Sequence, residues 1–238
     1  MPQSDIEEIY LNLGGKFITP ITKIQSKLKT IKAFIFDWDG VFNNGEKHSE
    51  GSSNFSEIDS MGTNMLRFSH FLKTGQMPLT AVISGEKNES AFWFCKRECF
   101  NYSFFKIANK TEALKFICEK ENIKPNEVAY FFDDILDLSM AEICGIRVLI
   151  NRRANPLFIN YCIKNNLVDY LTAAESGNFA IREASELLIA LNQNFDEVLT
   201  FRKVYSQSYK AYIENRRKVE TKFFTTNKIA IIEQSLEI

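Results

Sequence analysis

Two aspartates separated by one residue follow an apolar run near the start of the sequence. The run Ile31–Phe36 leads directly into Asp37-Trp38-Asp39-Gly40. Because positions i and i+2 of an extended chain point to the same side, the carboxylates of Asp37 and Asp39 can face the same way. Two close carboxylates repel each other, and a divalent cation such as Mg²⁺, which prefers oxygen ligands, removes the repulsion. The pattern by itself is equally compatible with a solvated turn.

A second apolar run ends in residues that suit phosphate chemistry. Leu79–Ile83 is followed by Ser84 and Gly85. Ser84 offers a hydroxyl donor, and Gly85 allows a ligand to approach the backbone closely. Lys110 stands just before a predicted helix and supplies a positive charge. These residues could therefore bind the oxygens of a phosphoryl group.

A third apolar run, Val128–Phe132, ends in a group of carboxylates. Asp133, Asp134 and Asp137 lie within five residues of one another. Three carboxylates beneath a buried strand are difficult to explain by packing, whereas a bound divalent cation explains them.

Alternating strands and helices are predicted to position these polar residues. Apolar runs rich in β-branched and aromatic residues predict strands over Ile31–Phe36, Leu79–Ile83, Tyr102–Ile107, Val128–Phe132 and Ile146–Ile150. The helices predicted between them are Met61–Lys73, Glu86–Glu98, Thr111–Glu121 and Leu136–Cys144. This alternation predicts an α/β fold, a three-layer, Rossmann-like parallel sheet with helices on both faces. Ligands bind at the carboxyl ends of such strands, where the polar residues should gather.

Two terminal segments extend beyond this core. Residues 1–30 precede the first strand and are predicted to contain a helix over Ile21–Leu28. Residues 194–238 form a second helical extension, with one long amphipathic helix predicted over Phe195–Phe224 from aromatic and apolar residues at helical spacing. The catalytic domain is therefore predicted to span 31–193, and no gap between its motifs is long enough for a large cap domain.

The composition is that of a globular protein and excludes several function classes. The chain has 238 residues, 45% of them hydrophobic, and 29 basic against 30 acidic residues give a formal net charge of −1. A near-neutral chain provides no electrostatic case for a nucleic-acid or anionic-membrane partner. No apolar run approaches the roughly 18 residues of a membrane span. Five scattered cysteines and an acidic N-terminus without signal-peptide character indicate a reduced, cytoplasmic protein.

The order of the motifs resembles that of the haloacid dehalogenase superfamily of phosphohydrolases. The resemblance is closer to the 3-deoxy-D-manno-octulosonate 8-phosphate phosphatase family, which includes phosphatases of nine-carbon sialic-type sugar phosphates. The residues that carry it are Phe34-Ile35-Phe36-Asp37-Trp38-Asp39-Gly40-Val41, Phe55, Asp59 and Gly62, Ile83-Ser84-Gly85, Lys110, Ala129-Tyr130 leading to Asp133, Asp134 and Asp137, and Gly177 with Ala180-Ile181-Arg182-Glu183.

The resemblance implies a Mg²⁺-dependent phosphatase that acts on a small phosphorylated sugar or sugar acid. Asp37 would be the nucleophile that forms an aspartyl-phosphate, and Asp39 the general acid that protonates the leaving sugar oxygen and then activates water. Ser84 and Lys110 would hold the phosphoryl oxygens, with the backbone of Gly85 beside them.

The resemblance also implies a metal site and a further substrate residue. The implied Mg²⁺ site comprises the carboxylates of Asp37 and Asp133 and the backbone carbonyl of Asp39, supported by Asp134 and Asp137. Arg182 is a candidate for binding the substrate anion, although an ion pair with a nearby acid explains it equally well.

Several features depart from the family pattern. Phe132 and Ser60 replace glycines, and Glu86 stands where arginine is common. The stretch 40–55 is shorter than the β-hairpin through which relatives form tetramers, so a homo-oligomer is expected by resemblance alone. These departures favour an alternative hypothesis, a non-catalytic protein of the same fold with an assembly or regulatory role.

Overall fold

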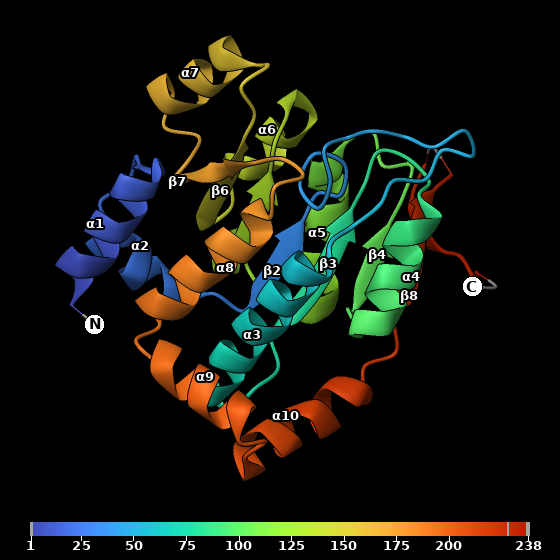
Figure 1. The fold of residues 1–238 in the computed structure, drawn as a ribbon. Coiled ribbons are helices and arrows are strands. Elements are labelled where there is room, and N and C mark those ends of the chain that lie inside the picture. The colour runs from blue at the N-terminus through green and yellow to red at the C-terminus, as the bar shows by residue number, and fades with distance from the viewer. Residues whose placement is uncertain (1, 228, 237–238) are drawn as a thin grey trace.

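A computed structural model describes residues 2–227 and 229–236, and its centre is a nine-stranded sheet (Figure 1). The strands are β1 (Lys16–Phe17), β2 (Ala33–Phe36), β3 (Leu79–Ile83), β4 (Tyr102–Phe104), β5 (Val128–Phe132), β6 (Ile146–Asn151), β7 (Tyr170–Glu175), β8 (Lys222–Thr226) and β9 (Ile231–Glu233). Their order is β1-β7-β6-β5-β2-β3-β4-β8-β9. The strands from β7 to β8 are parallel, and β1 and β9 are antiparallel to their neighbours.

The inner strands form where the sequence predicts buried apolar runs. The five predicted strands are β2 to β6, and β3 and β5 have the predicted bounds. Every residue of β2, β3 and β5 is buried, as expected for a parallel sheet with helices on both faces. Phe36 of β2 pairs with Val82 of β3 and with Phe131 of β5, so these strands end within one residue of one another.

Helices cover both faces of the sheet (Figure 1). The helices are α1 (Gln3–Leu13), α2 (Ile21–Leu28), α3 (Glu57–Thr74), α4 (Glu89–Glu98), α5 (Lys110–Glu121), α6 (Leu138–Ala141), α7 (Pro156–Lys164), α8 (Ala180–Leu191), α9 (Phe195–Lys203) and α10 (Gln207–Arg217). α5, α6 and α7 pack on a core that contains Ile35 and Phe132, and the other helices pack on a core that contains Phe34 and Phe36. The predicted three-layer α/β fold is confirmed, and the described residues form no large cap domain.

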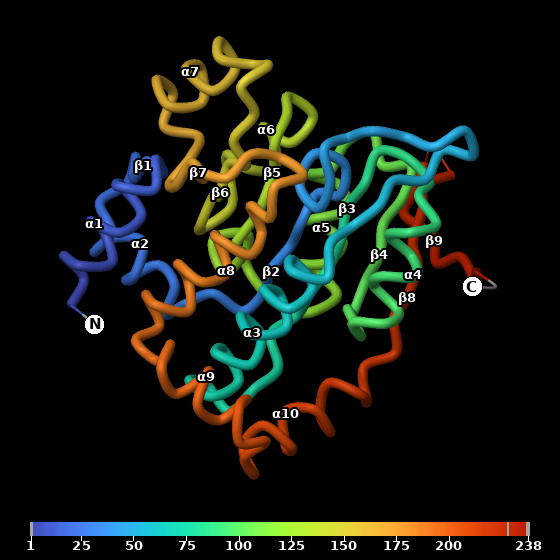
Figure 2. The backbone as a smooth tube through the Cα atoms, in the orientation of Figure 1, coloured from blue at the N-terminus to red at the C-terminus, as the bar shows by residue number. Residues whose placement is uncertain are grey.

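The single long helix predicted over Phe195–Phe224 is wrong. The chain forms α9 and α10 and then enters the sheet as β8, which lies parallel to β4 (Figure 2). The helices are separated at Tyr205, whose φ of 50° is left-handed, and the side chain of Ser206 caps α10. Phe223 and Phe224 are then drawn into apolar clusters beside β4, so the C-terminal extension is not purely helical.

The N-terminal helix α2 has the predicted bounds, but the sequence analysis overlooked α1, β1 and β7. The first and last strands of the chain join the same sheet as the predicted catalytic core. The division into 1–30, 31–193 and 194–238 stays a prediction. Among the helices that the structure describes, none has the length and apolar character needed to cross a membrane.

Candidate active site

The carboxyl ends of β2 and β5 and the start of α5 bring three predicted residues together. The backbone N–H of Asp37 donates to the carbonyl of Phe131 at 2.9 Å, which continues the β2–β5 ladder into the site. The ammonium of Lys110 lies 2.5 Å from one carboxylate oxygen of Asp37 and 2.5 Å from one of Asp137. All three side chains are buried, so the lysine compensates charges that would otherwise be isolated from water.

Three carboxylates in this site are arranged to hold a cation. Oxygens of Asp37, Asp133 and Asp137 lie within 4.8 Å of one another, and all three residues are buried. Arg152 donates to Oδ2 of Asp133, whereas Oδ1 of Asp133 is buried without a hydrogen-bond partner. An unpartnered buried carboxylate oxygen is unfavourable, and a divalent cation bound to it would satisfy it. The donor set therefore fits a hard metal ion.

Burial and mutual repulsion raise the pKa values of two of these carboxyls. Burial, together with repulsion from Asp137, raises the pKa of Asp37 to about 6, although Lys110 opposes the rise. Burial and the charges of Asp37 and Asp137 raise the pKa of Asp133 to about 9, and Arg152 opposes that rise. A nearby positive charge would favour the ionised forms of both groups.

The turn over residues 37–40 is shaped by the core below Trp38 and by the carboxylate beside Gly40. Trp38 is fully buried and stacks on Phe42 at 5.0 Å between ring centroids, so it is a core residue. Gly40 has a φ of +88°, and a Cβ atom there would lie 2.0 Å from Oδ2 of Asp133. Glycine is required at this position because both the backbone conformation and the carboxylate exclude a side chain.

Asp39 lies at the rim of the site, where a hydrogen bond and an ion pair hold its carboxylate. Ser53 Oγ donates to Asp39 Oδ1 at 2.5 Å, and Lys47 forms an ion pair with Oδ2. The amide of Asn88 donates to Ser53 Oγ at 2.6 Å, and the same side chain caps the start of α4. Ser53 and Asn88 are buried. Asp39 is therefore oriented by a hydrogen-bonded chain anchored on a helix.

Ser84 and Gly85 lie directly after β3. The backbone N–H of Glu86 donates to Ser84 Oγ at 3.2 Å, which leaves the hydroxyl proton free to point elsewhere. A Cβ atom at Gly85 would meet only the carbonyl oxygen of Ile107, at 3.9 Å. The backbone at Gly85 is thus open to a ligand.

These residues line one cleft of about 510 Å³. Its lining comprises Asp37, Asp39, Gly45, Lys47, Ser84, Gly85, Glu86, Ile107, Ala108, Lys110, Asp133, Asp134, Leu136, Asp137 and Arg152. All predicted catalytic and metal-binding residues are among them, which agrees with the expectation that polar strand ends meet at one edge of the sheet.

Like Asp39, the predicted residues Asp134 and Arg182 lie outside the cluster formed by the three buried aspartates and Lys110. Asp134 lies in the lining, but its exposed carboxylate accepts from the backbone N–H of Ile135 at 2.7 Å and caps the turn. Arg182 is absent from the lining: it lies on α8, where its Nε pairs with Glu186 at 2.7 Å. The ion-pair interpretation therefore accounts for Arg182 within this chain.

Three residues of the site were not predicted from the sequence. Arg152 follows β6, and a basic residue at the carboxyl end of a strand was a usable signal. The hydroxyl of Tyr130 donates to Asp137 Oδ1 at 2.6 Å from within β5. Lys47 comes from the loop after β2, where no local pattern indicated its contact with Asp39.

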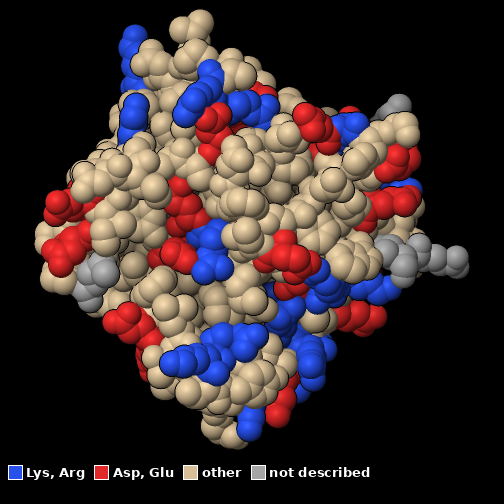
Figure 3. Space-filling view, in the orientation of Figure 1, with Lys and Arg blue, Asp and Glu red and all other residues tan. Residues whose placement is uncertain are grey.

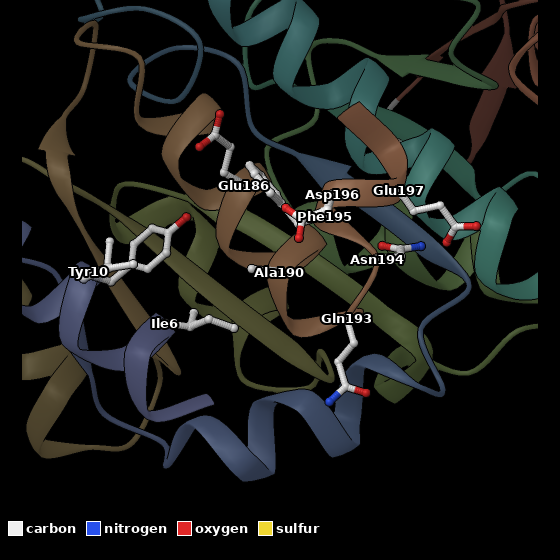
Figure 4. Close-up of a pocket in the computed structure, with 10 residues that line it drawn as sticks. Ile6, Tyr10, Glu186, Ala190, Gln193, Asn194, Phe195, Asp196 and Glu197 are labelled. Carbon is white, nitrogen blue, oxygen red and sulfur yellow. The ribbon is translucent and has the colours of Figure 1, made fainter. Parts of the chain in front are cut away.

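A second hollow, of about 550 Å³, lies between α1, α8 and α9 (Figure 4). Its lining includes the apolar side chains of Ile6 and Ala190. Three acidic residues also line it, Glu186, Asp196 and Glu197. None of the predicted site residues lines it, and it lacks both the basic group and the strand ends of the cleft. The cleft above β2 is therefore the candidate active site.

Comparisons with known proteins point to one group of enzymes. The chain is 28% identical over 180 residues to 3-deoxy-D-manno-octulosonate 8-phosphate phosphatase of Salmonella typhi, covering 74% of this chain and 88% of that protein. The phosphatase of the same name from Haemophilus influenzae is 25% identical over 170 residues, covering 70% and 87%. No family model matches the chain.

Solved structures give the same result. The phosphatase from Moraxella catarrhalis, in complex with magnesium ion, phosphate ion and KDO, has a TM-score of 0.62 at 25% identity and covers 75% of this chain and 97% of that one. By sequence and fold, the chain is similar to 3-deoxy-D-manno-octulosonate 8-phosphate phosphatases. The cobalt-bound form of the Haemophilus influenzae phosphatase shares the fold, with a TM-score of 0.59 at 23% identity over 71% of this chain and 93% of that one.

The acidic cluster of this chain can be compared with the ions in those two structures. One neighbour holds magnesium and the other holds cobalt, both divalent metals. Asp37 and Asp133 offer carboxylate oxygens to a divalent ion, and Asp137 lies within the same cluster.

Proposed function

We propose that the protein is a Mg²⁺-dependent phosphomonoester hydrolase that acts through an aspartyl-phosphate on a small phosphorylated sugar acid of the 3-deoxy-D-manno-octulosonate 8-phosphate type. The observation that carries this proposal is the buried cluster of Asp37, Asp133 and Asp137 with Lys110, at the base of an open cleft. Phosphoryl transfer requires mainly positioning and charge neutralisation, and the cluster supplies both.

In the first step, a carboxylate oxygen of Asp37 attacks phosphorus. A new bond forms between that oxygen and phosphorus while the bond from phosphorus to the sugar oxygen breaks, and Asp39 gives its proton to the leaving sugar oxygen. In the second step, Asp39 takes a proton from water, whose oxygen attacks phosphorus and releases Asp37. The contact between Asp37 and Lys110 fixes one carboxylate oxygen and leaves the other for attack.

Other residues hold the phosphoryl oxygens. Ser84 Oγ, the open backbone at Gly85 and the ammonium of Lys110 all line the cleft. The carboxylates of Asp37 and Asp133, with the backbone carbonyl of Asp39, would hold Mg²⁺, which supplies positive charge beside the phosphoryl oxygens. We assign supporting roles to Asp134 and Asp137, which form the turn and the charge network around these ligands.

A sugar acid suits the charges at the rim of the cleft. Lys47 and Arg152 both line it together with the phosphoryl-binding groups, and each pairs with one carboxylate of the site, Lys47 with Asp39 and Arg152 with Asp133. A guanidinium in particular binds carboxylates in a bidentate way. A substrate with a phosphate at one end and a carboxylate at the other would place its two negative groups on these two regions. This supports the substrate class that the relatives' names indicate.

The test is phosphate release from a panel of sugar phosphates and phosphorylated sugar acids, with Mg²⁺ and with chelator. We expect turnover of a phosphorylated sugar acid that requires Mg²⁺ and disappears in Asp37→Asn. Asp196→Asn, a carboxylate of the second hollow, is the matched control and should retain activity. Absence of turnover on the whole panel, or turnover that survives Asp37→Asn, would overturn the proposal. Failure to bind beryllofluoride in the presence of Mg²⁺ would favour the non-catalytic alternative.

A further inference from the structure

A cavity rich in arginine lies at the end of the sheet opposite to the candidate active site. It has a volume of about 300 Å³ and is lined by Arg97, Cys99, Arg202, Tyr205, Tyr209, Ile213, Arg216 and Arg217. The lining comes from the C-terminal end of α4 and from α9 and α10, and Figure 1 shows α9 and α10 far from the loop that follows β2. The cavity shares no residue with the cleft.

The positive charge of this arginine cavity is only partly compensated. Arg97 pairs with Glu57 and Glu98, and Arg216 pairs with Glu98 at 2.7 Å. Within the described part of the chain, Arg202 and Arg217 form no ion pair. No acidic side chain lines the cavity itself. Two of its four arginines therefore lack a counter-charge, and Figure 3 shows basic side chains gathered over this part of the surface.

Arg202 packs on an aromatic ring, and its Nε has no hydrogen-bond acceptor. Its guanidinium lies 4.8 Å from the centre of the Tyr209 ring, and its Nε is buried without a hydrogen-bond partner. Tyr205 packs against Tyr209 with 5.2 Å between ring centroids, and it is 47% exposed. The cavity thus combines an unsatisfied buried donor, charge and an exposed aromatic face.

Arg216 is anchored by hydrogen bonds to the C-terminal end of α4. Its Nε donates to the carbonyl of Glu98 at 3.1 Å, and Arg67 donates to the carbonyls of Glu98 and Cys99. These bonds satisfy the free carbonyls at the end of α4, whose partial negative charge would otherwise oppose an anion. The helix end is thereby neutralised, and the remaining charge of the cavity is positive.

We propose that the arginine cavity is a binding site for a small phosphate-bearing anion, separate from the cleft. Guanidinium groups match phosphate oxygens in a bidentate geometry, and the cavity offers several of them around a space of small-molecule size. The exposed face of Tyr205 is available for a planar group attached to the phosphate. The motifs of the family resemblance end before α9 begins, so this site belongs to a part of the chain that those motifs do not include.

The test is calorimetric titration of the metal-free full chain with inorganic pyrophosphate and, separately, with ADP. Because Lys47, Lys110 and Arg152 also line the cleft, variants of the two sites distinguish binding in the arginine cavity from binding in the cleft. We expect the Arg202→Gln/Arg217→Gln variant to lose affinity by about tenfold or more for either probe, since each removed guanidinium loses a charged hydrogen bond. Tighter binding of ADP than of pyrophosphate would show that the ring of Tyr205 takes part.

The matched control is Lys203→Gln/Lys210→Gln, which removes the same charge from exposed residues outside the cavity. It should bind both probes with nearly unchanged affinity. Three results would overturn the proposal: no binding of either probe, an equal loss in the lysine control, or a loss of binding in Ser84→Ala with none in the arginine variant. Phosphatase activity is not the readout, so the outcome is independent of the proposed function.

Discussion

Replacing the buried carboxylate of Asp133 by an amide should stabilise the metal-free protein and abolish its response to Mg²⁺. Asp133 is 2% exposed, and its Oδ1 has no hydrogen-bond partner. Asp133→Asn keeps the shape of the side chain and an oxygen that can accept from Arg152, but removes a carboxyl whose ionised form is disfavoured by burial and by the charges of Asp37 and Asp137. The same change removes the ligand that would bind a metal ion most readily.

The size of the effect follows from linkage. Burial and neighbouring charges raise the pKa of Asp133 from 3.8 to about 9. The folded state then binds more protons than the unfolded state, so stability falls as pH rises from near 4 towards 9. At pH 7.5 the contribution is on the order of 5 kcal/mol, at about 1.36 kcal/mol for each pH unit above the unfolded pKa. A weaker bond to Arg152 offsets about 1–3 kcal/mol, which leaves a net gain of about 2–4 kcal/mol.

The assay is thermal and urea unfolding in EDTA and in saturating Mg²⁺, at pH 4.5 and pH 7.5. In EDTA at pH 7.5, Asp133→Asn should melt several degrees above the natural protein, at roughly 2–4 °C per kcal/mol, and the difference should shrink at pH 4.5. Mg²⁺ should stabilise only the natural protein, by about 2.7 kcal/mol at a concentration 100-fold above Kd. Asp134→Asn, an exposed neighbour whose amide can still cap Ile135, should leave stability in EDTA unchanged. A destabilised Asp133→Asn that still responds to Mg²⁺ would refute the reasoning.

Three further substitutions test the surroundings of the cluster. Gly40→Ala should destabilise the protein by about 2 kcal/mol or more in urea and weaken Mg²⁺ binding, because its Cβ meets a metal-site carboxylate. Gly51→Ala has the same backbone strain in open space, and an equal effect on Mg²⁺ binding there would contradict this explanation. Lys110→Met leaves the buried carboxylates of Asp37 and Asp137 without their ion-pair partner. It should lower the free energy of unfolding by about 3–5 kcal/mol at pH 7.5 but by much less near pH 4. A loss of stability that does not depend on pH would contradict the role of this ion pair. Ser53→Ala should lower kcat roughly tenfold without changing Mg²⁺ affinity, because it frees the candidate general acid. The control Ser52→Ala removes the hydroxyl of a half-buried neighbour that bonds Glu50 and should leave kcat unchanged. Equal kcat values for these two variants would show that the serine does not position the acid.

The inner sheet could be predicted because its signal is local. Leu79–Ile83 and Val128–Phe132 are short apolar runs buried on both faces, so hydrophobicity alone defines their bounds. Tyr170–Glu175 was overlooked because only part of it is buried and its residues do not form a continuous apolar run. The strand exists because it pairs with β6 and β1, and neither pairing has a local signature.

The C-terminal segment shows how tertiary contacts override helical spacing. Val198, Tyr209 and Tyr212 are buried, so the aromatic spacing did identify residues that face the core. The spacing could not reveal that the chain turns at Tyr205 or that Lys222–Thr226 pairs with β4. An amphipathic pattern predicts which residues are buried, but it does not show whether one helix or two carry them.

In the candidate site, too, some features could be predicted from the sequence and others depend on tertiary contacts. Asp37, Ser84, Lys110 and Asp133 line one cleft because each stands at a strand or helix end, where topology brings them together. The contacts that orient them come from residues distant in sequence, such as Arg152 on Asp133 and Asn88 on Ser53. Sequence spacing identifies the candidate catalytic groups, whereas the packing that holds them requires the structure.

The departures that favoured a non-catalytic protein have a different explanation in the structure. Phe132 is fully buried and stacks on Tyr130 with 5.7 Å between ring centroids, so it supports the residue that holds Asp137 and does not line the cleft. The loop after β2 forms no helix or strand through residue 56, all of which the structure describes, and it folds back onto its own site. Ser53 from this loop contacts Asp39 directly. Gly45 and Lys47 of this loop line the cleft, as does the exposed Glu86, and a turnover assay on the natural protein and Glu86→Gln would show whether the charge of Glu86 limits the rate.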